Sequence, residues 1–348
     1  ILIVEDGASL LSPQPIVTSE DDVLIQWIRQ TGPFWAANSE LYLQKYDYDG
    51  NPQWINPIVA AGPVVFPMGN WSQQSRADGD NGSFSAWTEM SGSVQNARVQ
   101  HITGIGVLSW TGGADLSANS SNFHISPQLT IANDTQELMA IWKEKTGSQS
   151  QIGVYAQRLD SGGNQLWGSN GTAVVALNSD YDYLDISVAG FEEDIIAAYI
   201  EQSVNMNGDI YAARLDAGGN GVWAGGAATV TNSGSPKSDM MIAEGPGCLF
   251  IAWTEGGSVY AHCLREDGTL GAPDNEPSTT YVPDDNFEQA LIDLGYDDVL
   301  NDSVLTENIS DVTTLNVGNK SISDLTGIQS FISLTTLHCY NNQLDSLD

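Results

Sequence analysis

The sequence predicts a mainly β fold: a five-bladed β-propeller, closed by an N-terminal strand and followed by a leucine-rich-repeat segment. Three observations predict it. A phrase of 14 residues recurs five times, a second shared phrase lies upstream of each copy, and the pattern changes near the C-terminus. A repeat of this period is a strong fold signal, because each unit buries its apolar face on the next unit.

Each copy of the recurring phrase has the pattern of a strand, a tight turn and a second strand. The copies are "LYLQKYDYDGNPQW", "ARVQHITGIGVLSW", "VYAQRLDSGGNQLW", "IYAARLDAGGNGVW" and "VYAHCLREDGTLGA". The upstream phrase places one aromatic residue at an equivalent position in every unit, namely Trp27, Trp87, Trp142, Tyr199 and Trp253. Gly, Asp and Asn mark the turns. Each unit therefore holds about four short strands, the number in a propeller blade, and we expect the repeated Trp side chains to fill the space between blades.

The two ends of this repeat region predict closure of the ring. Ile3 precedes Trp27 by 24 residues, as Val175 precedes Tyr199 by 24, so Ile3 and Val4 correspond to the last strand of a unit. The fifth unit has Ala272 where the other units have Trp. An N-terminal strand that completes the final blade would remove the exposed sheet edges.

A second region begins near Tyr281. We expect the propeller over residues 1–274, a linker over 275–283, and a cap helix with the first leucine-rich repeats over 284–348. Asp284 or Asp285 is a suitable N-cap, and Gly295 a suitable stop. The helix would bury one apolar face, made of Phe287, Ala290, Leu291 and Leu294.

The residues after this helix carry a leucine-rich-repeat pattern. Leu315 and Leu337 lie 22 residues apart, and Leu337, Cys339, Asn342 and Leu344 fit the repeat consensus. Asn342 is placed to bond backbone amides at the turn, and Cys339 occupies an apolar position as a packed free thiol. Fewer than about three repeats cannot bury their own face, so we expect the protein to continue beyond Asp348.

Composition limits the function classes. The net charge of −33 disfavours nucleic acid and anionic lipid as partners. No apolar run approaches the roughly 20 residues that span a bilayer, so direct membrane insertion is not expected. The beginning, "ILIVEDGASL", suggests a processed chain. Cys248 and Cys263 would be diagonal neighbours across a hairpin that turns at Gly256 and Gly257, which favours free thiols over a disulfide.

Two segments, "VYAQRLDSGGNQLW" and "TYVPDDNFEQALIDLGYDDVLNDSVLTENISDVTTL", carry a resemblance to a known class. The sequence resembles modular secreted and cell-surface bacterial proteins of the type IX secretion kind. The resemblance implies an extracellular location or one on the outward face of the outer membrane. It also implies protein or glycan partners at the cell surface, including an outer-membrane complex, and it brings no catalytic motif.

Two functions compete for this architecture. One is a non-catalytic binding, adhesion or scaffold module, and the other is a polysaccharide-acting enzyme, a glycoside hydrolase with its site in the propeller funnel. Glycoside hydrolysis needs two carboxylates in different environments. The obvious carboxylates are related by the repeat, with Arg29 in the first unit: they are Glu89, Glu144, Glu201 and Glu255. Symmetry would give them like surroundings, so the sequence favours hydrogen-bond anchors for turns and a protein that is not an enzyme.

Recognition should then use the loops that break the repeat. Phe34 and Trp35 in "TGPFWAANS", and Trp71 in "PMGNWSQQ", could stack on sugar rings or anchor a protein partner, and loop packing is the alternative.

Two acidic loops raise the question of a metal. The pairs Asp47 with Asp49 and Asp78 with Asp80 begin oxygen-rich loops, for which turn formation is favoured over calcium binding and no cofactor is expected. His101 and His262 are expected to be strand residues and not metal ligands.

Overall fold

The structure of the protein is a computed structural model. It describes residues 8–20, 22–32, 38–66, 73–131, 137–191, 193–203, 208–245, 247–271 and 279–344. The chain forms two compact units, Ile1–Gly271 and Ala272–Asp348, and each is described by itself. Among the described residues, no helix has the length and apolar character needed to cross a membrane.

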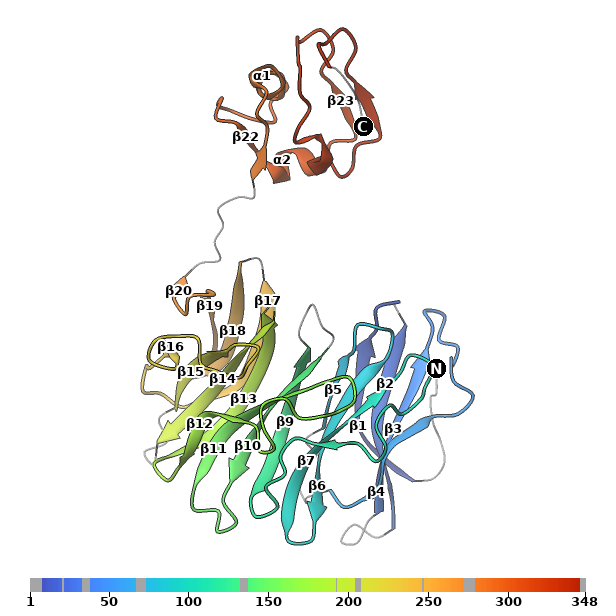
Figure 1. Ribbon diagram of the computed structural model, residues 1–348, viewed down its shortest axis with the longest axis vertical. Helices are drawn as coiled ribbons and strands as arrows, with labels where there is room; N and C mark the ends of the chain where they lie inside the picture. The colour runs from blue at the N-terminus through green and yellow to red at the C-terminus, as the bar shows by residue number, and fades with distance from the viewer. Residues whose placement is uncertain are drawn as a thin grey trace. The chain divides into compact units, whose positions relative to one another are not determined.

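The first unit consists of five four-stranded antiparallel sheets that follow one another along the chain (Figure 1). The strands are β1 (Ser9–Val17), β2 (Val23–Thr31), β3 (Asn38–Tyr46) and β4 (Ile58–Val64) in sheet 1; β5 (Gln73–Ala77), β6 (Ser83–Ser91), β7 (Val94–Ile102) and β8 (Ala114–Asp115) in sheet 2; β9 (Phe123–Ile131), β10 (Leu138–Lys145), β11 (Ile152–Leu159) and β12 (Thr172–Asn178) in sheet 3; β13 (Tyr181–Phe191), β14 (Asp194–Ser203), β15 (Gly208–Leu215) and β16 (Ala228–Thr231) in sheet 4; and β17 (Lys237–Gly245), β18 (Cys248–Glu255), β19 (Ser258–Leu264) and β20 (Leu270–Gly271) in sheet 5. The prediction of a mainly β fold built from repeated antiparallel sheets is confirmed. Ile3 and Val4, the predicted closing strand, lie outside the described residues.

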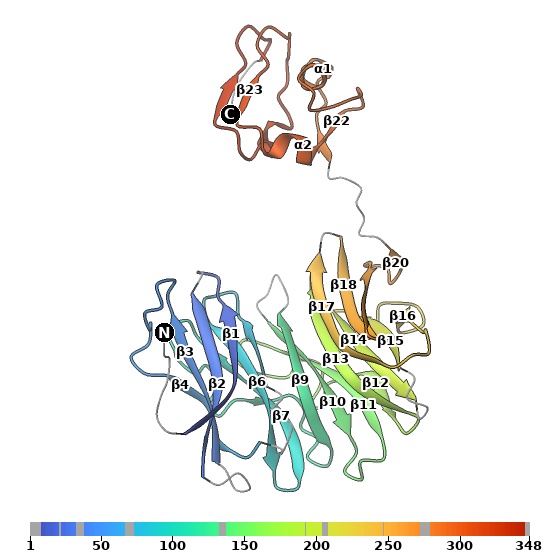
Figure 2. The same cartoon turned by 180° about the vertical axis from the view of Figure 1, so that it is seen from behind.

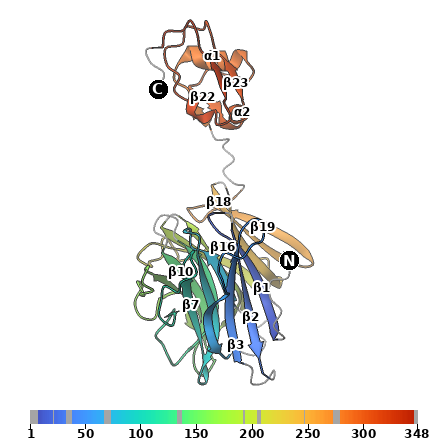
Figure 3. The same cartoon turned by 90° about the vertical axis from the view of Figure 1, so that its right-hand side faces the viewer.

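Each sheet packs on the next through its own hydrophobic cluster, and Figure 2 shows the sheets following one another in chain order. Four of the five repeated aromatic residues lie in these clusters, namely Trp87, Trp142, Tyr199 and Trp253, and Trp142 is fully buried. In Figure 3 the strands of sheet 1 lie side by side. Arg76 of sheet 2 and Glu244 of sheet 5 form an ion pair of 3.8 Å, so two sheets that are not consecutive also approach each other.

A second series of repeated tryptophans joins each sheet to a turn of the next. The indole nitrogen of Trp110 donates a hydrogen bond to the carbonyl of Ser161, at 2.9 Å. The indoles of Trp54, Trp167 and Trp223 make equivalent bonds, each to a carbonyl that lies about one repeat later in the chain. Gly163, in the predicted turn, has a φ of +80°, and a Cβ there would lie 2.8 Å from the Trp110 ring. The turn therefore needs glycine for its conformation and for the close approach of the indole.

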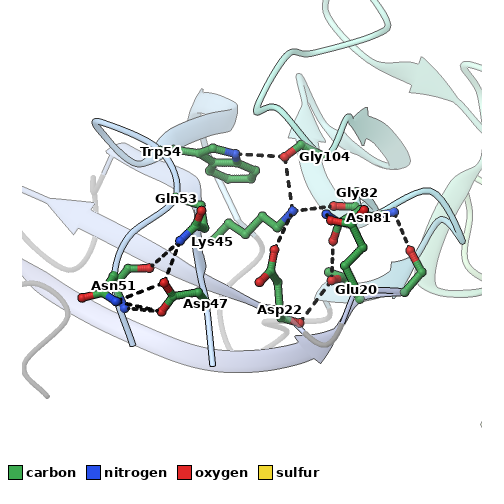
Figure 4. A network of polar contacts seen from close by, with 12 residues as sticks. Glu20, Asp22, Lys45, Asp47, Asn51, Gln53, Trp54, Asn81, Gly82 and Gly104 are labelled. Carbon is green, nitrogen blue, oxygen red and sulfur yellow. Dashed lines mark hydrogen bonds and ion pairs between the residues drawn. The ribbon is translucent and has the colours of Figure 1, made fainter. Parts of the chain in front are cut away.

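Figure 4 shows this junction between sheets 1 and 2. Trp54 donates to the carbonyl of Gly104, and the Lys45 ammonium lies 3.0 Å from Asp22 and 3.2 Å from the carbonyl of Asn81. Lys45 is buried, so its positive charge is compensated by these oxygens.

The cysteines of sheet 5 correct the sequence prediction. Cys248 and Cys263 form a disulfide, although free thiols were favoured. The hairpin turns at Gly256 and Gly257 and pairs Phe250 with Cys263, as expected. The sequence analysis expected the two cysteines to be too far apart for a disulfide. In the structure their Cα atoms lie 5.7 Å apart, which is within the range of a disulfide.

Loss of this disulfide should destabilise the first unit. The two cysteines are 15 residues apart, and a loop of that length contributes about 3 kcal/mol by restricting the unfolded chain. We expect the double variant Cys248→Ser/Cys263→Ser to lose about that much free energy of unfolding in urea titrations. Cys339→Ser, at the free and half-buried cysteine, is the control. Equal stability of wild type and double variant would contradict the prediction.

In its described residues, the second unit contains two α-helices, a 3₁₀ helix and short strands. Its elements are β21 (Thr279–Tyr281), α1 (Asp285–Asp293), β22 (Ser303–Leu305), α2 (Thr306–Ser310), β23 (Thr314–Asn316), the 3₁₀ helix η2 (Ile328–Ser330) and β24 (Thr336–His338). Asp284 caps α1 by accepting bonds from the amides of Asn286 and Phe287, which confirms the predicted cap. Because β21 pairs with β22, residues 279–281, which the sequence analysis assigned to the linker, belong to this unit.

The predicted apolar face of α1 is only partly confirmed. Phe287, Ala290 and Leu291 are buried in the core of this unit. Leu294 is 45% exposed, because the helix ends at Asp293 and Gly295 turns the chain with a φ of +81°.

The two predicted leucine repeats lie in register. Parallel pairing of β23 and β24 places Leu315 opposite Leu337. The Asn342 side chain accepts bonds from the amides of Lys320 and Ile322 and donates to the carbonyl of Val317, so its predicted role at the turn is confirmed. Cys339 is a free thiol packed against the core.

Candidate functional site

The repeated glutamates anchor aromatic rings, and two of them also anchor turns or loops as predicted, because Glu144 accepts a bond of 2.7 Å from Asn122 and Glu255 accepts one from Ser233. In sheets 2 and 5 the glutamate accepts a hydrogen bond from the indole two residues earlier. The distance is 2.7 Å from Trp87 to Glu89 and 3.0 Å from Trp253 to Glu255. The corresponding bond of Glu144 in sheet 3 measures 3.3 Å. In these sheets the carboxylate is thus committed to holding the scaffold.

Sheet 1 shows how close the two facing positions of this repeat come. Arg29 replaces the glutamate, and its cross-strand partner is Glu40. The two side chains form an ion pair of 3.3 Å. A residue at the glutamate position can therefore contact the side chain opposite it on the third strand.

Sheet 4 departs from the repeat in two ways. Its core aromatic is Tyr199 and not Trp, so Glu201 has no indole donor two residues earlier. The residue opposite Glu201 is Asp209, whereas Asn96, Gly153 and Ser258 lie opposite the other repeated glutamates. Directly opposed residues have Cβ atoms about 4.5 to 5.5 Å apart. Glu201 and Asp209 therefore form a carboxylate pair on the face that sheet 4 turns toward sheet 3.

The two members of this pair have different surroundings. Burial raises the pKa of the Glu201 carboxyl, and the nearby Asp209 raises it further, against a lowering contribution from the Tyr183 hydrogen bond. The Tyr183 hydroxyl donates to Glu201 over 3.4 Å and accepts a bond of 2.8 Å from the Asn178 amide. Burial raises the pKa of Tyr183 to about 12, so its hydroxyl stays a donor. The Oδ1 atom of Asp209 is buried and has no hydrogen-bond partner.

A cavity of about 360 Å³ lies near this pair; its lining does not include Tyr183, Glu201 or Asp209, but it includes Asn178, which bonds the Tyr183 hydroxyl. Its lining comes from the ends of β10, β11, β12, β13 and β14, and includes Lys145, Gln151, Asn178, Asp180, Tyr181, Asp182 and Gln202. Tyr181 and Asp182 precede Tyr183 on β13, and Gln202 follows Glu201 on β14. We refer to the cavity together with Tyr183, Glu201 and Asp209 as the sheet 3–4 site.

Lys143 reinforces the wall of this site. Its ammonium donates a 3.0 Å hydrogen bond to the carbonyl of Leu184 on β13. Burial lowers the pKa of Lys143, and the charges of Asp182 and Asp185 oppose this shift. In the other sheets the equivalent residue is Ile or Thr, so this cation is particular to the junction of sheets 3 and 4.

The sequence contained signals for this site that symmetry reasoning passed over. Treating the glutamates as equivalent hid two exceptions, Tyr199 in place of Trp and Asp209 opposite Glu201. Lys143 and Lys145 after Trp142 are a third exception in the repeat alignment. The sequence analysis looked for function where the repeat is broken, but it applied this rule only to loops and not to strand residues.

The predicted recognition residues Phe34, Trp35 and Trp71 lie outside the described residues. Two of the aspartates weighed as calcium ligands accept hydrogen bonds within turns, the role that the sequence analysis favoured. Asp47 bonds the amide and side chain of Asn51 (Figure 4), and Asp78 accepts bonds from the amides of Asp80 and Gly82.

The two histidines considered as ligands lie on strands, as predicted: His101 on β7 and His262 on β19. His101 lies 2.8 Å from an Asp78 oxygen, which adds a second structural contact to that carboxylate.

One further titratable pair belongs to the core. His124 lies 3.8 Å from Glu144, and both side chains are almost completely buried. Burial lowers the pKa of His124. Because both side chains are closed off from solvent, we assign this pair to the packing of sheet 3.

No family model matches the sequence. Internalin J of Listeria monocytogenes serotype 4b (strain F2365) is 32% identical over 80 residues, and this stretch covers 23% of the chain but only 9% of that protein. Among solved structures, polysaccharide lyase Uly1 is similar with a TM-score of 0.44 and 11% identity, covering 74% of this chain and 58% of that one. An alpha-L-arabinanase of Penicillium chrysogenum is similar with a TM-score of 0.40 and 13% identity, and the match covers 75% of this chain and 91% of that one. A GH43_1 enzyme of Xanthomonas citri is similar with a TM-score of 0.41 and 12% identity, and the match covers 78% of this chain and 94% of that one.

This finding corrects one expectation from the sequence. The chain was expected to be a non-catalytic binding, adhesion or scaffold module and not an enzyme, but these similar structures are enzymes, among them a polysaccharide lyase and an arabinanase. The physical reason for the error is the assumption of equal surroundings for the repeated glutamates, which sheet 4 does not meet.

Proposed function

We propose that the first unit is a glycoside hydrolase that cleaves a polysaccharide, with Glu201 and Asp209 as the reacting carboxylates. The observation that carries this proposal is their direct opposition on β14 and β15, in a repeat that elsewhere opposes glutamate with a residue that carries no carboxylate. Glycoside hydrolysis uses two carboxyl groups, one that donates a proton and one that acts as base or nucleophile.

The different surroundings assign the roles. Glu201, with its raised pKa, is the proton donor to the leaving oxygen. Asp209, which is half-buried, is the nucleophile: it bonds the anomeric carbon as the glycosidic bond breaks and Glu201 protonates the leaving oxygen. A water that Glu201 deprotonates then hydrolyses the glycosyl–Asp209 ester and restores both carboxyl groups. Tyr183 holds Glu201 through its hydroxyl, which Asn178 orients in turn, so it is a positioning residue. The cross-strand spacing favours the shorter carboxylate separation of retaining enzymes, about 5 to 5.5 Å.

The test is hydrolysis of a polysaccharide panel by the full chain. Release of reducing ends from at least one polysaccharide is expected, with the first product keeping the anomeric configuration of the substrate in proton NMR. Product that carries an unsaturated sugar would indicate elimination and reject the proposal. So would the absence of cleavage across neutral and anionic polysaccharides.

The proposal includes a closed five-bladed propeller. In sheets 1 to 4 the third strand pairs with a fourth strand along its central residues, but β19 pairs only at Cys263 and Leu264 in the described part of the chain. Val259 on this edge is 76% exposed. Its equivalent in sheet 3, Val154, pairs with Val175, which corresponds to Ile3 in the repeat alignment.

A cross-link tests this closure. Cysteines at directly opposed strand positions lie within disulfide range. The double variant Ile3→Cys/Val259→Cys is expected to form an intramolecular disulfide on mild oxidation, seen as a mass loss of two protons and faster gel migration. Ile3→Cys/Val17→Cys is the control, because Val17 is also exposed but lies on β1. Equal cross-linking of both variants, or none in either, would argue against the closed ring.

We further propose that the second unit begins a leucine-rich-repeat solenoid and that the protein acts outside the cytoplasm. The parallel β23 and β24, with Asn342 at the turn, support the solenoid. The disulfide supports an oxidising compartment such as the cell exterior. Export by the type IX route and display on the outer membrane remain part of this proposal, with a surface glycan as the principal partner.

A further inference from the structure

The cavity of the sheet 3–4 site is lined mostly by polar and charged residues, with Ile152 and Tyr181 as its apolar part. Amide, hydroxyl, carboxylate and ammonium groups surround about 360 Å³, together with one aromatic ring. This volume lies at the lower end of the range for small-molecule sites. We propose that the cavity is the subsite for an uncharged sugar unit of the substrate, with Tyr181 as its platform. The inference rests on the hydrolase function proposed above and adds the substrate class.

Two lining groups are free to bind hydroxyls. In the described part of the chain, neither the Lys145 ammonium nor the Gln151 side-chain amide has a hydrogen bond or ion pair. Every arginine and every other lysine has an ion-pair or hydrogen-bond partner; for example, Lys237 lies 3.7 Å from Glu255. Lys145 is half-buried and Gln151 is exposed, and polar groups without protein partners can bind a ligand that both donates and accepts hydrogen bonds, as sugar hydroxyls do.

Charge decides between neutral and anionic sugars. Asp180 and Asp182 line the cavity, whereas Lys145 is the one cation among its described lining residues. Glu201 precedes the lining residue Gln202 on β14, Asp209 lies opposite Glu201 on β15, and the whole chain has a net charge of −33. A uronate or a sulfated sugar would face this excess of carboxylates, which costs binding energy. A neutral sugar meets the same carboxylates as hydrogen-bond acceptors.

Tyr181 supplies the apolar contact. Its side chain is 42% exposed at the rim of the cavity, and its amide is held by the Asn178 side chain at 3.2 Å. A fixed, partly exposed ring offers a flat surface to the C–H face of a sugar.

The cavity and the carboxylate pair are connected through one side chain. Asn178 lines the cavity and bonds the Tyr183 hydroxyl, which bonds Glu201. Tyr181 lies two residues from Tyr183 on β13, roughly 7 Å along the strand. A polysaccharide bound at the carboxylates would therefore place a neighbouring sugar unit in the cavity.

Binding without turnover tests the inference. The Glu201→Gln full chain is run in native gels that contain matched polysaccharides: polygalacturonate and its carboxyl-reduced form, carrageenan and its desulfated form, and neutral arabinan. Retardation is expected with at least one neutral polymer and roughly tenfold weaker with its charged counterpart. Tyr181→Ala should weaken retardation roughly tenfold, and in the active chain raise KM more than it lowers kcat.

Two variants sharpen the result. Tyr181→Phe keeps the ring and should lose less affinity than Tyr181→Ala. Tyr48→Ala removes a tyrosine that is 93% exposed on sheet 1, far along the chain from this site, and should leave binding unchanged. Preference for a charged polymer, with loss of binding in Lys145→Met, would overturn the inference in favour of an anionic sugar.

The outcomes separate this inference from the hydrolase proposal. If polysaccharides are cleaved without preference for neutral ones, the inference falls and the hydrolase stands. If none is cleaved but neutral polymers bind in a manner that depends on Tyr181, the hydrolase falls and the subsite stands. If nothing is cleaved or bound, both fall.

Discussion

Replacement of Glu201 by glutamine is expected to lower kcat on the cleaved polysaccharide by about 10²- to 10⁴-fold, the contribution of a positioned proton donor. Glutamine keeps the size of the side chain and can still accept the Tyr183 hydrogen bond, but it cannot protonate the leaving oxygen. The binding assay described above should therefore still detect substrate. Initial rates of reducing-end release measure the effect.

The pH profile gives an independent check on Glu201. The donor must carry its proton, so activity should fall as pH rises through the raised pKa of this carboxyl. A dinitrophenyl glycoside needs no protonation of its leaving group, so its kcat/KM should lose this alkaline limb. With this substrate Glu201→Gln should release dinitrophenolate in a burst, and added azide, which needs no base, should restore turnover.

The matched control is Glu255→Gln in sheet 5. Glu255 occupies the same repeat position but bonds Trp253 and Ser233, and Ser258 lies opposite it. Its replacement should leave kcat near the wild-type value. If both variants lose activity equally, the repeated glutamates act through the scaffold, and the assignment of Glu201 as donor is wrong.

The second large effect concerns stability. Trp142→Ala should lower the free energy of unfolding by about 3 to 5 kcal/mol, the cost of removing a large buried aromatic side chain. Trp142 is fully buried between sheets 2 and 3, and its indole also donates to Glu144. Urea denaturation followed by circular dichroism measures the loss without relying on tryptophan fluorescence.

Trp223→Ala is the control for this substitution. Trp223 belongs to the other tryptophan series, is only half-buried, and donates to the carbonyl of Glu266. A clearly smaller loss is expected, because less apolar surface leaves the core. Equal losses would mean that burial between the sheets does not set the contribution of these aromatics.

A catalytic site within a repeat scaffold requires only small departures from the repeat. Tyr199 stands where four other units have Trp, so Glu201 lacks the indole hydrogen bond that holds the other repeated glutamates. Asp209 places a second carboxylate opposite Glu201. Neither change disturbs the sheet, because Tyr199 stays buried and stacks on Tyr211. Sheet 4 thus keeps its structural role while one of its faces carries the carboxylate pair of the proposed site.

By itself, the sequence determined the features that depend on residues close along the chain. The repeat spacing predicted the strands and the buried tryptophans, glycine and aspartate predicted the turns, and Asp284 predicted the start of α1. Only the tertiary structure decided that Cys248 bonds Cys263, that Leu294 is exposed, and that Glu201, Asp209 and Tyr183 meet beside a polar cavity. The physical reason is that repeat patterns reflect the average environment of a position, whereas pairing register, burial and the chemistry of one exceptional junction depend on which strands face each other in space.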